Sequence, residues 1–229
     1  MEVGNNNIAF SIGDKDGIKI TINAPLIIKE TLQKIIKGWI FEETRLELDI
    51  SIKKIENKYS LLSKRINSKP REDFLDFIND LLNEIAINFS QKSELSLIHC
   101  IAFEGIDKKK ILVFGRHGAG KSSYMIKNKD KILNIYADDI LLFSKKNLSF
   151  YSLGFPIRVR RPVKNFKILR TNCLLGERLC YVFSKNLFIK EFKTFFFPDY
   201  IFEINNNYQL IAESILNLDK KIHKYMIKV

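Results

Sequence analysis

A glycine-rich octapeptide between two apolar runs constrains this chain more than any other feature. Residues 115–122 read Gly-Arg-His-Gly-Ala-Gly-Lys-Ser and satisfy the pattern G-x-x-x-x-G-K-[ST] at every fixed position. The apolar run 111–114 predicts a strand that enters this loop, and residues 123–126 predict the start of a helix that leaves it. Backbone N–H groups in such a loop can surround one anion, aided by the positive end of the helix dipole. We therefore expect an α/β or α+β fold with a P-loop nucleotide-binding domain.

The side chains of the loop predict how it would hold a nucleotide. Lys121 would reach the β- and γ-phosphates, and the Ser122 hydroxyl would bind the Mg²⁺ that bridges them. Arg116 and His117 are unusual in such loops, and they either contact phosphate or point to solvent. A glycine-rich turn that matches by accident is the alternative. The predicted nucleotide-binding residues are Gly115, Arg116, His117, Gly118, Ala119, Gly120, Lys121, Ser122 and Ser123.

Two consecutive carboxylates follow further along the chain. The apolar run 132–136 leads into Asp138 and Asp139, and a second predicted strand resumes at residues 140–143. Buried carboxylates are costly unless a cation meets them, and magnesium at the phosphate loop would do so. A second acid there could take the proton of an attacking hydroxyl. Because neighbouring strand residues point to opposite faces, only one aspartate would face the γ-phosphate. An Asp-Asp turn between two strands is the alternative.

The rest of the chain carries ordinary folding patterns. They predict an N-terminal hairpin, two early helices, a series of short buried strands and a closing helix. We expect two units, an N-terminal α+β subdomain over residues 1–92 and the nucleotide-binding domain over residues 93–229. The predicted helices cover 26–36, 74–89 and 210–222, and the predicted strands cover 8–12, 18–22, 46–52, 95–103, 111–114, 132–136, 140–143, 150–153 and 187–197.

Charge and composition narrow the class of partners. There are 38 Lys and Arg against 26 Asp and Glu, a net charge of +12, which favours nucleotides, nucleic acid or anionic lipid. Lysine occurs in every segment, however, so solvated surface explains most of this charge. Three cysteines without a C-x-x-C pair predict neither a disulfide framework nor a zinc site. No apolar run suits a membrane span and the first residues do not resemble a signal peptide, so we expect a cytoplasmic protein.

A basic segment follows the paired aspartates. Arginine binds phosphate through two parallel hydrogen bonds, so Arg158 and Arg160, on one face of a strand, could contact the triphosphate or an acidic substrate. A solvated edge strand is an equally weighted alternative. Nucleic-acid binding ranks lower because no recognised nucleic-acid module accompanies the charge. The cations of this segment are Arg158, Arg160, Arg161, Lys164, Lys167 and Arg170.

In this order of motifs the chain resembles the HPr kinase/phosphorylase-like family, specifically its small stand-alone members. The resemblance rests on residues 97–102 around His99, residues 111–123 with the loop, residues 136–140 with both aspartates, and residues 153–160. It implies a fold similar to the nucleotide-binding domain of phosphoenolpyruvate carboxykinase. The implied activity is transfer of phosphate from ATP, with Mg²⁺, to a serine of a protein or peptide.

The resemblance also implies roles for single residues. His99 matches the active-site histidine of the family, Lys121 the loop lysine, Ser122 a magnesium ligand and Asp139 the proton acceptor. Asp138 lies beside that acceptor and is expected at the metal. Without the resemblance, His99 at the end of an apolar run would more often be a satisfied core histidine.

Two departures from the family pattern limit what it implies. Ser123 stands where HPr kinases often have glutamate, and no Glu occurs between Asp139 and Gly176, where those enzymes have a further magnesium ligand. HPr as substrate and the reverse phosphorylase reaction are therefore in doubt. Two other functions stay open: a nucleotide-binding regulatory or assembly protein without phosphotransfer, and a nucleic-acid-associated P-loop protein. The oligomeric state also stays open.

Overall fold

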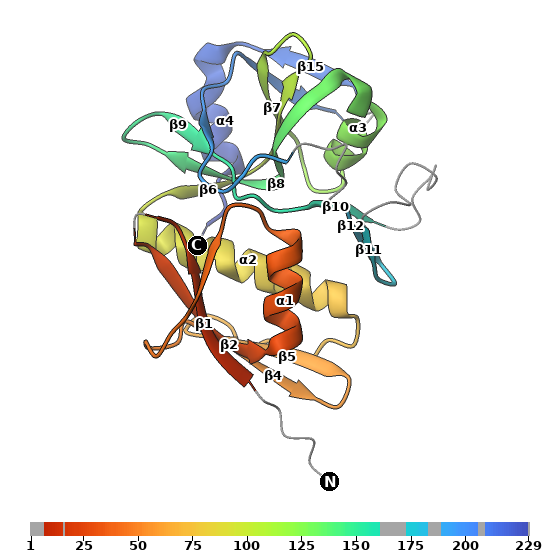
Figure 1. Cartoon of the computed structure of the whole chain (residues 1–229). Helices are drawn as coiled ribbons and strands as arrows, with labels where there is room; N and C mark the ends of the chain where they lie inside the picture. The colour runs from red at the N-terminus through yellow and green to blue at the C-terminus, as the bar shows by residue number, and fades with distance from the viewer. Residues whose placement is uncertain (1–6, 16, 161–172, 183–188, 206–208, 229) are drawn as a thin grey trace.

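The structure is a computed structural model of a mixed α+β protein (Figure 1), and it describes residues 7–15, 17–160, 173–182, 189–205 and 209–228. Within these residues, four α-helices accompany three sheets. A five-stranded sheet has the order β3-β1-β2-β4-β5, a seven-stranded sheet the order β13-β9-β8-β6-β7-β14-β15, and a small sheet the order β10-β12-β11. None of the helices among the described residues is long and apolar enough to cross a membrane.

The N-terminal residues form the five-stranded sheet and cover it with two helices. The predicted hairpin is confirmed, because β1 pairs antiparallel with β2 from Asn7↔Pro25 to Gly13↔Lys19. The prediction of a strand over 46–52 is wrong in its first half: Leu46 and Leu48 are exposed, and the strand begins at residue 50. The elements are β1 (Asn7–Gly13), β2 (Lys19–Pro25), α1 (Leu26–Ile35), β3 (Ile40–Glu43), β4 (Ile50–Ile55) and β5 (Lys58–Ser63).

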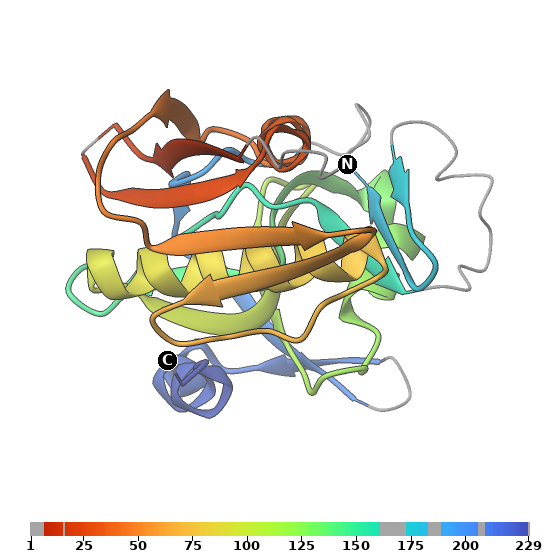
Figure 2. The ribbon, with the colours of Figure 1, turned by 90° about the horizontal axis from the view of Figure 1, so that it is seen from below.

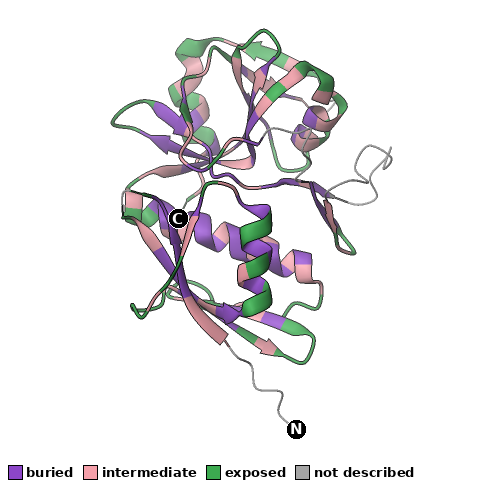
Figure 3. Ribbon diagram, viewed as in Figure 1, coloured by how far each residue is buried: buried purple, intermediate pink, exposed green. Residues whose placement is uncertain are grey.

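Helix α2 (Phe74–Ser93) lies between the five-stranded sheet and strand β6 (Ser96–Gly105) of the larger sheet, as Figures 1 and 2 show. Its N-terminus is capped by the Asp73 carboxylate, which accepts hydrogen bonds from two backbone N–H groups of the first turn. The periodic apolar residues that predicted this helix are buried on both sides of it (Figure 3). The 74–89 prediction is confirmed, and the helix continues for one more turn.

The seven-stranded sheet carries the motifs. Residues 132–144 form one continuous strand, β8, so the prediction of two strands ending and restarting at the aspartates is wrong. The pairing of β8 with β6 holds the chain extended through Asp138 and Asp139. The pairing of β8 with β6 outweighed the tendency of the Asp-Asp pair to form a turn. The other strands of the seven-stranded sheet are β7 (Lys110–Phe114), β9 (Ser149–Tyr151), β13 (Phe195–Phe196), β14 (Tyr200–Ile204) and β15 (Leu210–Glu213).

Two further predictions in the C-terminal third need correction. Residues 210–213 form β15 rather than helix, and the closing helix is confined to α4 (Leu218–Tyr225), after one 3₁₀ turn at Ile215–Asn217. Of the strand predicted over 187–197, only residues 195–196 are strand, while residues 187–188 lie outside the described residues. Short apolar runs fit either strand or helix, which explains the first error. The remaining elements are α3 (Lys121–Lys127), a 3₁₀ turn (Lys129–Lys131), β10 (Ile157–Arg160), β11 (Cys173–Leu175) and β12 (Leu179–Val182).

One hydrophobic cluster connects the N-terminal sheet with the later residues. Trp39, the only tryptophan, stacks on Phe192 with ring centroids 3.8 Å apart, and its indole N–H donates to the Leu153 carbonyl at 2.7 Å. Phe89 of α2 packs edge-on against both rings. In the described part of the chain no sheet combines strands from before and after residue 93, yet this core contains residues from both sides. The division into residues 1–92 and 93–229 therefore stays a prediction.

Candidate functional site

The glycine-rich loop lies between a strand and a helix, as its sequence predicts. Strand β7 enters it and α3 begins at Lys121. Gly118 and Gly120 have φ angles of +79° and +90°, which L-amino acids with a side chain rarely adopt. A Cβ atom on Gly115 would lie 2.4 Å from a methyl group of Ile204. These three glycines therefore hold a backbone path that other residues would strain.

Lys121 is buried although it carries a charged group. Its Nζ donates to the carbonyl oxygens of Gly115 at 2.8 Å and Arg116 at 3.2 Å, so the side chain folds back along the loop. Burial lowers the pKa of Lys121, and the nearby carboxylates of Asp139 and Asp138 partly oppose that shift. The two carbonyls accept hydrogen bonds from the ammonium but carry no charge. A phosphate group above the loop would add an anionic partner.

The order of strands separates the aspartates from the strand that leads into the loop. Strand β6 lies between β8, which carries both aspartates, and β7. His99 lies on that intervening strand, and its neighbour Cys100 pairs in register with Asp139. The three motifs of the sequence therefore meet on three consecutive strands, with His99 in the middle.

Both carboxylate oxygens of Asp139 have a side-chain partner. His99 Nε2 lies 2.8 Å from Oδ1, and Arg158 Nη2 lies 2.6 Å from Oδ2. The backbone of Asp139 has a φ angle of +127°, a conformation that costs an aspartate on the order of 1–3 kcal/mol. Strain of this kind persists only where the surrounding contacts enforce it, and it gathers at functional sites. His99 is thus no satisfied core histidine: it is partly exposed and paired with an acid.

The electrostatics of Asp139 follow from these partners. Burial alone would raise the pKa of its carboxyl, but the His99 hydrogen bond and the charges of Arg158 and Lys121 outweigh burial and lower it. Asp139 is therefore ionised over the neutral pH range. In this state its carboxylate is a firmly positioned hydrogen-bond acceptor and a weak base.

Asp138 has the opposite character. It is 8% exposed, and its Oδ2 accepts a hydrogen bond from the Arg158 backbone N–H at 2.7 Å. Its Oδ1 is buried and has no hydrogen-bond partner among the described residues. Burial raises the pKa of Asp138 to about 6, against the opposing effect of the Ser122 hydroxyl and the Arg158 N–H. A buried carboxylate oxygen without a hydrogen-bond partner, next to the loop serine, would be stabilised by a cation or by a proton.

These oxygens suit magnesium better than a metal that needs several protein ligands. The described residues contain no cluster of three His, Cys, Asp or Glu side chains that could hold a metal ion. Magnesium is commonly held by one or two protein oxygens, with phosphate oxygens and water completing the shell. Asp138 and Ser122 fit that donor set.

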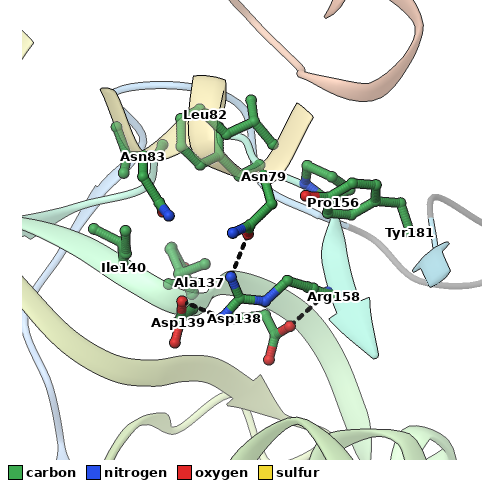
Figure 4. A pocket seen from close by; sticks show the side chains of 13 residues that line it. Asn79, Leu82, Asn83, Ala137, Asp138, Asp139, Ile140, Pro156, Arg158 and Tyr181 are labelled. Atoms are coloured by element: carbon green, nitrogen blue, oxygen red, sulfur yellow. Dashed lines mark hydrogen bonds and ion pairs between the residues drawn. The ribbon is translucent and has the colours of Figure 1, made fainter. Parts of the chain in front are cut away.

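Arg158 connects the site to the N-terminal part of the molecule (Figure 4). Besides its bonds to both aspartates, its Nη1 donates to the Asn79 Oδ1 of α2. β10 is an edge strand of its sheet, as the alternative interpretation expected, but the Arg158 side chain is only 18% exposed and is therefore not solvated. The side chain of Arg160 and residues 161–170 lie outside the described residues.

Two cavities meet at Asp139. One of about 150 Å³ lies over the loop and is lined by Gly118, Gly120, Lys121, Ser122 and Ser123. The other, of about 630 Å³, lies beside α2 and the C-terminal residues. The two cavities share four lining residues: His99, His117, Asp139 and Arg158.

The other predicted loop residues divide into three groups. His117 lines both cavities, with its ring centroid 6.2 Å from that of His99. Arg116 is exposed and lines neither cavity, which favours its orientation to solvent. Ala119 is buried in the core cluster with Val113 and Met125, so it supports the loop from below.

Sequence reasoning missed the residues that α2 and the C-terminus bring to the site. Asn79 and Asn83 lie one turn apart on the helix and line the larger cavity, as do Tyr225 and Met226. The only sequence signal for Asn79 and Asn83 is that both are neutral amides on the less apolar face of the helix. Solvent exposure explains that pattern equally well. Their role depends on a contact across the fold.

Comparison with known proteins leaves the family open. A scan against protein-family models gave no match to this chain, and a search of curated proteins gave none.

Proposed function

We propose that this protein is an ATP- and magnesium-dependent phosphotransferase that phosphorylates a serine of a protein or peptide, in the manner of the HPr-kinase-like family. The observation that carries the proposal is the meeting of the two cavities at Asp139. The loop cavity offers glycine N–H groups and Lys121 for the triphosphate, and the carboxylate lies where an acceptor hydroxyl would arrive.

The reaction assigns each group a role. The serine oxygen attacks the γ-phosphorus, the bond to the β,γ-bridging oxygen breaks, and ADP leaves. Asp139 accepts the serine proton, and its low pKa is tolerable because a loose transition state needs little prior loss of that proton. His99 and Arg158 keep the carboxylate in place, while Lys121 stabilises charge on the phosphoryl oxygens. Magnesium, held by Asp138 and Ser122, supplies further neutralisation of the phosphates when bound.

One observation favours a second candidate, a nucleotide-binding protein without phosphotransfer. Both oxygens of Asp139 already have side-chain partners, His99 and Arg158, so the base is restrained as well as positioned. Such a protein would bind ATP and leave serine unmodified.

Phosphoserine formation separates these functions. The purified chain is incubated with γ-labelled ATP, Mg²⁺ and a degenerate serine-peptide library, with EDTA as the matched control, and the labelled amino acid is identified. Label on serine that requires Mg²⁺ supports the kinase. Saturable binding of ATP with no transfer to any peptide would instead establish the second candidate.

A further inference from the structure

The larger cavity lies on the acceptor side of Asp139. Of the loop it contacts only His117, whereas Lys121 and Ser122 line the smaller cavity alone. A donor seated on the loop would therefore present its γ-phosphate to Asp139 from one side. The cavity of about 630 Å³ opens on the same carboxylate from the other.

Secondary structure fixes both walls of this cavity. One wall is a stripe of α2, with Asn79, Asn83 and Ile87 at successive turns of the helix. The opposite wall is the segment after α4, where the Ile227 N–H donates to the Leu97 carbonyl at 2.8 Å and Met226 bridges to Ile98. A cavity built on a helix and a paired strand is preformed rather than induced.

The lining combines a largely aliphatic surface with two carboxamides and Lys224, whose ammonium is paired with Glu203 at 2.8 Å. Six apolar side chains contribute: Ile87, Leu97, Ile140, Tyr225, Met226 and Ile227. The side-chain amide of Asn83 is half-buried and has no hydrogen-bond partner among the described residues, and Figure 4 shows it projecting from α2 toward Ile140 of β8. A carboxamide pairs with a peptide group through one donor and one acceptor, while aliphatic walls bind aliphatic side chains.

We propose that this cleft binds the acceptor as a short peptide segment in which an aliphatic residue adjoins the phosphorylated serine. The inference rests on the proposed kinase function and specifies its substrate class. The aliphatic side chain packs against Ile87 and Ile140, Asn83 pairs with a backbone peptide group, and the serine hydroxyl faces Asp139. The volume falls within the roughly 300–1,000 Å³ range of preformed binding sites.

The test narrows the cleft without touching the catalytic groups. Asn83→Trp places a large side chain in the cleft from the wall that α2 forms. Gln33→Trp places the same side chain on the exposed face of α1 and is the matched control. Both variants and the wild type receive γ-labelled ATP, Mg²⁺ and the serine-peptide library, and labelled peptides are sequenced. A fluorescent ATP analogue measures nucleotide binding, and thermal unfolding checks the fold. Asn83→Ala, which only removes the amide, is the milder companion.

The proposal predicts that labelled peptides are enriched in Ile, Leu, Val or Met next to serine. It also predicts that Asn83→Trp lowers peptide labelling at least about tenfold with nucleotide affinity unchanged, that Gln33→Trp does neither, and that Asn83→Ala raises the peptide KM more than it lowers kcat. Serine labelling without aliphatic enrichment, or undiminished in a folded Asn83→Trp variant, overturns the cleft assignment and leaves the kinase intact. A wild type that labels no peptide overturns the proposed function itself.

Discussion

The loop side and the cleft side of Asp139 differ in how they are encoded. The loop cavity is built from consecutive residues, so its backbone path, its lysine and its serine are local consequences of one segment. The cleft takes its walls from α2, β6, β8 and the residues after α4, which are far apart along the chain. In the proposed function, the local sequence specifies the phosphate site and tertiary packing specifies the acceptor site.

The two sides also differ in their charge. Lys121 and the glycine N–H groups lie on the loop side, whereas the cleft is lined by Asn83, aliphatic residues and Lys224, whose charge is paired with Glu203. Arg158 belongs to both, because one guanidinium contacts Asp139 and Asn79 together. If the two sides have separate functions, variants of each should fail in different ways.

The largest effect is expected on the loop side. Lys121→Ala removes the cation of the phosphate cavity and should lower phosphotransfer at least about 10³-fold and weaken ATP binding. The carbonyls of Gly115 and Arg116 lose their donor, so thermal unfolding of the variant checks that the fold persists. Kinetics with Lys131→Ala, an exposed lysine, serves as the control. Equal turnover in both variants would disprove the assignment of the loop.

The next effect concerns the carboxylate between the two sides. Asp139→Asn keeps the shape and one acceptor oxygen but cannot take a proton, so kcat should fall about 10²–10³-fold with ATP affinity nearly unchanged. Single-turnover transfer and nucleotide titration measure the two quantities. If Asp139→Asn instead weakened ATP binding and left the single-turnover transfer rate unchanged, the roles assigned to Asp138 and Asp139 would be reversed.

A smaller effect is expected where the cleft side supports the carboxylate. Asn79→Ala releases Arg158 from α2, and we expect kcat to fall about tenfold while the KM for ATP stays constant. Asn79→Asp, which retains an acceptor for the guanidinium, should restore most of the rate. Failure of that rescue would show that Asn79 serves the packing of α2 rather than the position of Arg158.

The smallest effect is on stability, and it distinguishes the two aspartates. Because burial raises the pKa of Asp138 to about 6, the folded protein holds this proton more tightly than the unfolded chain. That contribution to stability is present at low pH and is lost as pH rises from about 4 through 6. In the absence of magnesium and nucleotide, Asp138→Asn should raise Tm over the wild type by a few degrees at pH 8 and much less at pH 5. A difference that shrinks as pH rises would contradict the burial of this charge.

Particular residues show where sequence reasoning succeeded and where it could not. Residues 74–89 and the strand, loop and helix around residues 111–127 were predictable because their signals are local and periodic. A site role for His99 was implied by a family resemblance and not by spacing, and its pairing with Asp139 was not predicted. The strained backbone of Asp139 and the bond from Asn79 to Arg158 leave no trace in the sequence, since both depend on contacts between segments that fold together.

Hydrogen–deuterium exchange with β,γ-imido-ATP and Mg²⁺ tests the separation of donor and acceptor sides most directly. The analogue cannot transfer phosphate, so it reports only where the donor is held. We predict strong protection of residues 115–123 and little change over residues 79–87 of α2, which wait for the acceptor. Protection concentrated on α2 and residues 225–227, with the loop unaffected, would place the nucleotide in the cleft and contradict the account.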